Sequence, residues 1–313
     1  MKKFLTKTLI FLLPVLCIVI GIFMTEPDRN SLWNGSPGDC ENRGHWINYR
    51  LNQDSTPVDI AFLGTSRTIN GIQDTLVSRI LSDKTGHSVH AVNLGYCRFG
   101  SDLMTVIMRD LVNTKKPKLI VIEVNEQFIG SSHPMFPYYA TNEDLHSTAV
   151  LYNQAASANF YNGFLARLGH FRNQTFNFPQ DTSFVGWNLE EVYGYRRYPG
   201  SAPLAELQST KRKGSRLSTL RELEVVYPME WLNRTLAIAA AAKIQVVFLY
   251  APSYSGTAFP TEGMSFYSQN AKLLSPEQRF RDPSMWRDRD HFNDKGASEF
   301  SRWLANQIAE VMN

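Results

Sequence analysis

The chain of 313 residues lacks the motifs by which most metal and nucleotide enzymes are recognised. It has three cysteines and seven histidines, but neither an H-E-x-x-H motif nor paired C-x-x-C motifs, so the usual zinc sites are excluded. It also lacks a Walker loop and a G-x-G-x-x-G motif. The sequence therefore predicts no metal and no cofactor.

The excess of positive over negative charge is also small. The formal net charge is only +3, which is too small to indicate binding to nucleic acid. Apolar residues make up 43% and charged residues 19%, as in globular chains, so a largely disordered chain is excluded. The length suits one large α/β domain with an anchor, or two small domains.

Long apolar runs are absent except near the N-terminus. An uncharged run from Thr8 to Thr25 follows Lys2, Lys3 and Lys7. The run is just long enough for a membrane-spanning helix, and the lysines favour a cytoplasmic N-terminus with the remainder exported. A cleaved signal peptide is the alternative, but no A-x-A-like site follows. We expect residues 1–27 to form an uncleaved, single-pass anchor in the cytoplasmic (inner) membrane.

Residues 28–57 are polar and contain several glycines and prolines, which predicts a tether or N-terminal arm. Trp33 and Trp46 would dock this arm on the domain or lie near lipid headgroups. Cys40 lies in the arm and Cys97 lies further along the chain. An exported chain can oxidise such a pair, but the sequence is also compatible with two free thiols.

Four apolar runs predict buried strands at residues 58–63, 88–93, 118–124 and 244–250. Helical patterns follow or separate them, at residues 71–81, 101–112, 217–242 and 295–312. We expect Pro228 to interrupt the third helix and Asp294 to cap the last. This alternation predicts a three-layer α/β/α domain with a central parallel sheet over residues 58–313.

An aromatic-rich stretch interrupted by prolines occupies about residues 128–217. We expect it to be an inserted, mostly helical region. It would either shape a substrate groove, with aromatic platforms for sugar rings, or form a small satellite core. Its basic cluster is either a solvated loop or a contact to anionic lipid or polymer; the members are Lys211, Arg212, Lys213 and Arg216.

The first predicted strand leads through Gly64 and Thr65 to Ser66 and then to a helix. This arrangement places a hydroxyl at the carboxyl edge of a parallel sheet, where open α/β sheets have their sites. An ordinary strand-to-helix loop is the alternative, because Thr68 takes the place of the last Gly of a G-x-S-x-G motif.

His291 lies three residues after Asp288, in a loop that leads into the last helix. At this spacing the Asp288 carboxylate can reach Nδ1 of the imidazole, which leaves Nε2 free to take a proton from Ser66. Asp290 is a competing acid, but an adjacent side chain rarely points back at its neighbour's ring.

Four segments, FLGTSRTINGI, NLGYCRFG, VIEVNE and DRDHFNDKGA, resemble in this order the sequence blocks of the SGNH (GDSL-like) hydrolase superfamily. The likeness covers about residues 58–310. It is closest to the membrane-anchored branch that includes the D-alanyl transfer protein of lipoteichoic acid. The resemblance implies an SGNH, flavodoxin-like fold.

The resemblance also implies roles for single residues. Ser66, His291 and Asp288 would form a catalytic triad. Asn125 would donate to the oxyanion, with the Ser66 N–H and a glycine that is either Gly95 or Gly100. Three positions depart from the family: Thr65 stands in place of its Asp, Glu123 in place of a Gly, and Glu126 in place of an Asp that is one methylene shorter. The sequence does not show whether Glu123 faces the site.

Together, the anchor and the resemblance imply a serine-dependent acyl transfer on a cell-envelope polysaccharide or polymer. The chain would act as an O-acyltransferase or acyl relay, with an acylated donor, an envelope glycan or polymer acceptor and a membrane-bound O-acyltransferase as partner. The first alternative is an extracytoplasmic carbohydrate or lipid esterase. The second is a non-catalytic envelope assembly or binding protein. No nucleic-acid partner is expected.

Overall fold

The computed structural model describes residues 1–34, 40, 43–124, 130–176, 194–208, 221–254, 261–276 and 279–312. In this part of the chain, five parallel strands form one sheet in the order β2-β1-β3-β4-β5. The strands are β1 (Ile60–Leu63), β2 (Ala91–Asn93), β3 (Leu119–Val124), β4 (Gln245–Tyr250) and β5 (Lys272–Leu274). This is the flavodoxin-like doubly wound order, in which the direction of winding reverses between β1 and β3. The expected α/β class with a parallel sheet is confirmed.

Each of the four predicted strand regions contains a strand, although β1 begins two residues late and β2 three residues late. The strand β5 was not predicted from the sequence. It spans only Lys272–Leu274 at the sheet edge, and three residues are too few to show an apolar pattern.

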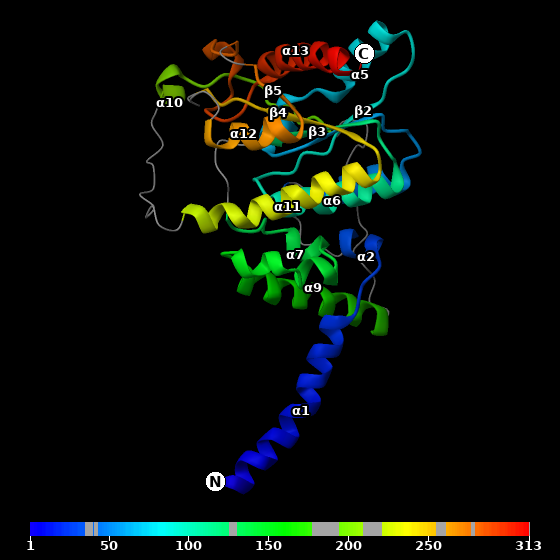
Figure 1. Ribbon diagram of the computed structural model, residues 1–313, viewed down its shortest axis with the longest axis vertical. Coiled ribbons are helices and arrows are strands. Elements are labelled where there is room, and N and C mark those ends of the chain that lie inside the picture. Colours follow the sequence, from blue (N-terminus) through cyan, green and yellow to red (C-terminus); the bar gives the residue numbers. More distant parts are fainter. Residues whose placement is uncertain are drawn as a thin grey trace.

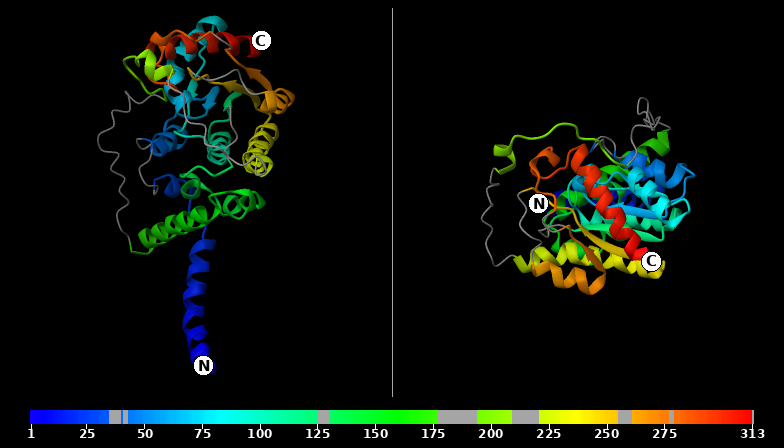
Figure 2. Two further views of the ribbon diagram at one scale, coloured as in Figure 1. Left: turned by 90° about the vertical axis from the view of Figure 1, so that its left-hand side faces the viewer. Right: turned by 90° about the horizontal axis from the view of Figure 1, so that it is seen from above.

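Helices cover both faces of the sheet (Figures 1 and 2). One face carries α4 (Ser66–Gly71), α5 (Asp74–Thr85) and α13 (Asp294–Met312), and the other carries α6 (Ser101–Thr114) and α11 (Arg221–Ala241). Successive strand residues point to opposite faces. Phe62 and Val121 therefore belong to the core under α5 and α13, whereas Leu63 and Ile122 belong to the core under α6 and α11.

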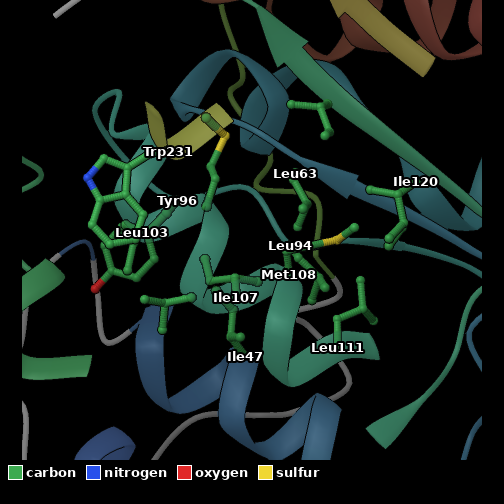
Figure 3. Close-up of a cluster of buried hydrophobic side chains, with 14 of the residues drawn as sticks. Ile47, Leu63, Leu94, Tyr96, Leu103, Ile107, Met108, Leu111, Ile120 and Trp231 are labelled. Atoms are coloured by element: carbon green, nitrogen blue, oxygen red, sulfur yellow. The ribbon is translucent and has the colours of Figure 1, made fainter. Parts of the chain in front are cut away.

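Helix α6 is buried along most of its length, because the sheet packs on one side of it and the N-terminal arm on the other. Figure 3 shows this core, with contributions from the sheet, α6 and the arm: Leu63, Leu94, Ile107, Met108, Leu111, Ile120 and Ile47. The arm contains α2 (Arg29–Asn34), α3 (Arg43–Asn48) and a π-helical turn at Tyr49–Gln53.

The arm is therefore packed on the domain, which is the first of the two options given for Trp33 and Trp46. Trp33 is fully buried and donates from its indole nitrogen to the Asp110 carboxylate of α6 at 2.7 Å. Trp46 is buried as well.

The last helix begins differently from the expectation. Asn293 caps α13, because its side-chain oxygen accepts from the Gly296 N–H at 3.0 Å. Asp294 is instead the first helical residue, and its carboxylate accepts from Tyr195 and Arg197 of the inserted region. Helix α11 also differs, because it continues through Pro228.

The described part of the inserted region is mainly helical. Its elements are α7 (Phe136–Tyr139), α8 (Asn142–Leu145), a 3-10 turn at Thr148–Tyr152, α9 (Ala156–Phe176) and α10 (Leu204–Gln208). The basic cluster at 211–216 lies outside the described residues. The remaining short elements are α12 (Thr261–Asn270) and a 3-10 turn at Pro283–Met285.

Helix α1 (Lys2–Met24) projects away from the domain (Figure 1). Among the described residues it is the one helix long and apolar enough to cross a membrane, with a mean hydropathy of 2.5 over its most apolar window. Its 23 residues span about 35 Å at 1.5 Å per residue, slightly more than the hydrocarbon thickness of a bilayer.

Candidate active site

Ser66 lies at the carboxyl end of β1, beside the point where the winding of the sheet reverses. Thr65 caps the short helix α4, since its hydroxyl accepts from the Arg67 N–H at 3.1 Å. Ser66 is the first helical residue and is half-buried. Its own N–H has no hydrogen-bond partner among the residues that the structure describes.

The loop that carries Ser66 is fastened to the sheet by Glu123 of β3. This buried carboxylate accepts from the Thr65 N–H and the Thr65 hydroxyl, both at 2.7 Å. It also accepts from the Thr68 N–H at 3.2 Å and the Thr68 hydroxyl at 2.5 Å. Four donors, two before Ser66 in the sequence and two after it, therefore converge on the Glu123 carboxylate. A Cβ on Gly64 would lie 2.5 Å from the same carboxylate, so this close approach requires glycine.

The loop before α13 holds His291 in place through Asp288. The Asp288 carboxylate accepts from the backbone N–H groups of Asp290 at 2.8 Å and His291 at 3.0 Å. The His291 carbonyl accepts in turn from the backbone N–H of Arg287 at 3.0 Å. This closed turn orients the carboxylate toward the imidazole of the same loop.

The three side chains predicted to act together lie in one hydrogen-bonded chain. Nε2 of His291 lies 2.7 Å from Oγ of Ser66, although the two residues are 225 positions apart. Nδ1 of His291 lies 2.9 Å from both carboxylate oxygens of Asp288. Partial burial raises the pKa of Asp288, but hydrogen bonds from His291 and the Asp290 N–H outweigh this, and the net pKa is lowered. Asp288 is therefore ionised at neutral pH.

The competing acid, Asp290, points elsewhere. Its carboxylate lies 3.1 Å from the Arg67 guanidinium, which also donates to the Ala251 carbonyl. The pair joins the residue after Ser66 to the residue before His291. The ring of Tyr198, from the inserted region, meets the His291 ring edge-on at 6.0 Å between centroids.

The structure describes only some of the residues that were expected to donate to the oxyanion. Asn125 lies outside the described residues. The Gly95 N–H donates to the Asn93 side chain at 3.1 Å, and Asn93 also donates to the Thr68 and Ile72 carbonyls. The Gly95 N–H therefore has an acceptor within the scaffold, and the choice between Gly95 and Gly100 as oxyanion donor stays a prediction. Gly100 is buried at the start of α6 against His133, which a Cβ there would meet at 2.4 Å.

A disulfide joins Cys40 to Cys97 and pins the arm beside this part of the site. Arg43, also from the arm, is buried and donates to the Gly95 and Asn93 carbonyls at 2.8 and 2.5 Å. Burial lowers its pKa to about 10, although the nearby Asp74 opposes this. Neither Arg43 nor the role of Glu123 was predicted from the sequence. An acid within an otherwise apolar strand is the signal that marks Glu123, because buried carboxylates need partners.

This geometry suits nucleophilic chemistry. His291 can remove the Ser66 proton while Asp288 holds the imidazole and stabilises its charged form. The Ser66 N–H can donate to a developing oxyanion. Among the described residues, no group of three or more His, Cys, Asp and Glu side chains could hold a metal ion.

Comparisons with known proteins identify no family. No family model matches the chain, and no curated protein matches it. Among solved structures, it is similar to a gut microbial diltiazem-metabolizing enzyme at 13% identity and a TM-score of 0.29. That similarity covers 83% of this chain and 48% of the other protein, so the chain spans about half the length of that enzyme. A similarity this distant supports no inference about activity.

Proposed function

We propose that the chain is a membrane-anchored serine acyl-transfer enzyme of the SGNH superfamily, acting on a polysaccharide or polymer of the cell envelope. The observation that carries the proposal is the contact of 2.7 Å between Ser66 Oγ and His291 Nε2, with Asp288 on the other ring nitrogen. Ser66 attacks an ester carbonyl while His291 takes its proton and passes it to the departing donor alcohol, which leaves an acyl-serine. His291 then takes the proton of an acceptor hydroxyl, which attacks the acyl-serine, and returns it to the Ser66 oxygen as the acyl group leaves.

Two further features support this proposal. The order Ser, Asp, His along the chain and the position of Ser66 after β1 suit the SGNH resemblance. Helix α1 carries Lys2, Lys3 and Lys7 in its first two turns, ahead of its apolar run, which favours a cytoplasmic N-terminus and an extracytoplasmic domain. A chain fixed at the envelope side of a membrane suits a polymeric acceptor and an acyl donor delivered by a membrane-bound O-acyltransferase.

The test is labelling of the purified full chain with a fluorophosphonate or an activated ester. Wild type should form a covalent adduct on Ser66, and Ser66→Ala should form none while keeping its thermal stability, because a half-buried loop hydroxyl is removed at little cost. Ser298→Ala, on α13, is the matched control and should label normally. Undiminished labelling of Ser66→Ala would contradict the triad.

An esterase is the second candidate, because the His291 side chain is 22% exposed and water can reach the base. The two candidates differ in the fate of the acyl-enzyme. Slow hydrolysis with rapid discharge to an added glycan hydroxyl favours transfer. Rapid hydrolysis that an acceptor does not compete with favours the esterase.

Reporter fusions after Asn30 that are active only in the cytoplasm would contradict the proposed topology.

A further inference from the structure

Helix α9 has its polarity reversed relative to a helix of a water-soluble domain. Its buried positions are Asn159, Gly163 and Arg167, two of which are strongly polar. Six of its large apolar side chains are instead exposed, with exposed fractions between 37% and 66%, and Phe164 is half-buried; the six are Phe160, Tyr161, Leu165, Leu168, Phe171 and Phe176. A soluble helix places its apolar stripe toward the core.

The exposed apolar residues form a single face. At about 100° per residue they fall within an arc of about 160°, and the buried positions are centred about 140° from its middle. The exposed Arg172 and Thr175 fall within the same arc, so the face is mainly but not wholly apolar. A large exposed apolar surface rimmed by polar residues marks an interaction site. Its composition of aromatic rings and leucines is that of helices that lie in a membrane interface.

The position of α9 identifies what covers this face. In Figures 1 and 2 α9 lies crosswise at the end of α1 where α1 enters the domain. The Phe23 ring of α1 lies 5.9 Å from the Phe160 ring, centroid to centroid. If α1 crosses a bilayer, its C-terminal end lies at the bilayer surface, and α9 then lies along that surface.

The buried arginine fixes the two helices relative to each other. Arg167 donates to the Asn142 side chain at 2.8 Å, and Asn142 donates in turn to the Met24 carbonyl at the end of α1 at 2.9 Å. The Arg167 guanidinium also lies 5.8 Å from the centre of the Phe23 ring. Desolvation lowers the pKa of Arg167, and Glu26 opposes this. The polar side of α9 is thus occupied by the α1 junction, which turns its apolar side outward.

We propose that α9 is an interfacial membrane helix, which embeds its exposed Phe, Tyr and Leu face in the headgroup and upper acyl region of the bilayer that α1 crosses. This inference rests on the proposed membrane anchoring by α1. It gives the domain a second lipid contact and a fixed orientation on the membrane, with α13 on the side away from it (Figure 1).

The test is site-directed spin labelling of the full chain in lipid nanodiscs. Cys17 on α1 is the one cysteine outside the disulfide, so its label reports directly on the anchor. In a Cys17→Ser background, Leu165→Cys and Leu168→Cys place labels on the apolar face of α9. Asn306→Cys, exposed on α13, is the matched control. Collisions with oxygen and with a water-soluble nickel complex are compared.

Labels at positions 165 and 168 should favour oxygen over nickel, at about 5–10 Å below the headgroups, whereas the label at 306 should favour nickel. Nickel access at 165 and 168 equal to that at 306, with position 17 in lipid, would overturn the inference and leave the anchor intact. Shielding of 165 and 168 from both reagents would overturn it too, because protein would then cover this face. A nickel-accessible label at position 17 would instead refute the anchor, and with it the proposed membrane contact of α9.

Discussion

The fastening of the Ser66 loop by Glu123 can be tested by neutralising that one side chain. Glu123→Gln keeps the shape of the side chain but replaces an acceptor oxygen with a donating NH₂ group. The four hydrogen bonds from Thr65 and Thr68 lose their charge assistance, and one donor faces another donor. We expect Ser66 to be held less firmly against His291.

The expected loss in the free energy of unfolding follows from the contacts of Glu123. Hydrogen bonds to charged groups contribute about 1.5–3 kcal/mol and neutral ones about 0.5–1.5 kcal/mol. Four weakened bonds would cost about 4 kcal/mol, but the amide is also cheaper to bury than the carboxylate, so we expect a net loss of about 1–3 kcal/mol. Glu123→Ala leaves the backbone N–H groups of Thr65 and Thr68 unpaired, at about 1–3 kcal/mol each, which gives about 2–6 kcal/mol.

The assay combines unfolding in detergent with the rate of fluorophosphonate labelling at a temperature where each variant is folded. Because a displacement of about 1 Å can slow such a reaction about 10²-fold, labelling should slow by more than the fraction unfolded explains. Glu299→Gln, an exposed neutralisation on α13, is the control and should change neither quantity. Wild-type stability and wild-type labelling in Glu123→Gln would refute the argument.

Two further predictions concern other carboxylates. Asp288→Asn removes the anion that orients His291, so labelling should slow by about 10²–10⁴-fold; Asp290→Asn should have a much smaller effect, and equal effects would show that the acids were wrongly assigned. Asp144 accepts two hydrogen bonds from Arg109, at 2.8 and 2.6 Å; burial raises its pKa, but Arg109 lowers it to a net value below the usual range. A lowered folded-state pKa gives stability that is present above the unfolded pKa of about 3.9 and lost as pH falls through the folded value. Asp144→Asn should therefore cost about 1–3 kcal/mol at pH 7, and its deficit in melting temperature should shrink below about pH 4, whereas a pH-independent deficit would contradict this origin.

Four of the five strands could be predicted because each lies in a run with enough apolar residues to show a pattern. The runs at 58–63 and 118–124 are buried on both faces of the sheet, and burial on both sides is what makes a run continuous. The packed arm could not be predicted in the same way. Trp33 is held by Asp110, a contact between residues 77 positions apart, and no local pattern reports such a contact.

The pairing of Ser66 with His291 was predictable for a different reason. The Asp288 and His291 spacing is local and sets the geometry of the loop, whereas the distance to Ser66 depends on the whole sheet order. The resemblance supplied that long-range part as an expectation. The outward orientation of the apolar face of α9, by contrast, could not be predicted. Its aromatic residues were visible in the sequence, but outward and inward faces can be told apart only when the neighbours of the helix are known.

Two of the positions at which the chain differs from the SGNH pattern that it resembles are physically connected. Thr65 stands where the family has an acid, and Glu123 stands where the family has a glycine, and in this structure the two side chains are hydrogen-bonded to each other at 2.7 Å. The carboxylate that is missing beside Ser66 in the sequence is thus supplied in space by the neighbouring strand β3. A glycine at 123 would leave the Thr65 and Thr68 N–H groups without this acceptor, and an acid at 65 would place a second negative charge against Glu123. Thr65 and Glu123 are therefore complementary, and replacing either one alone by the residue of the pattern would be unfavourable.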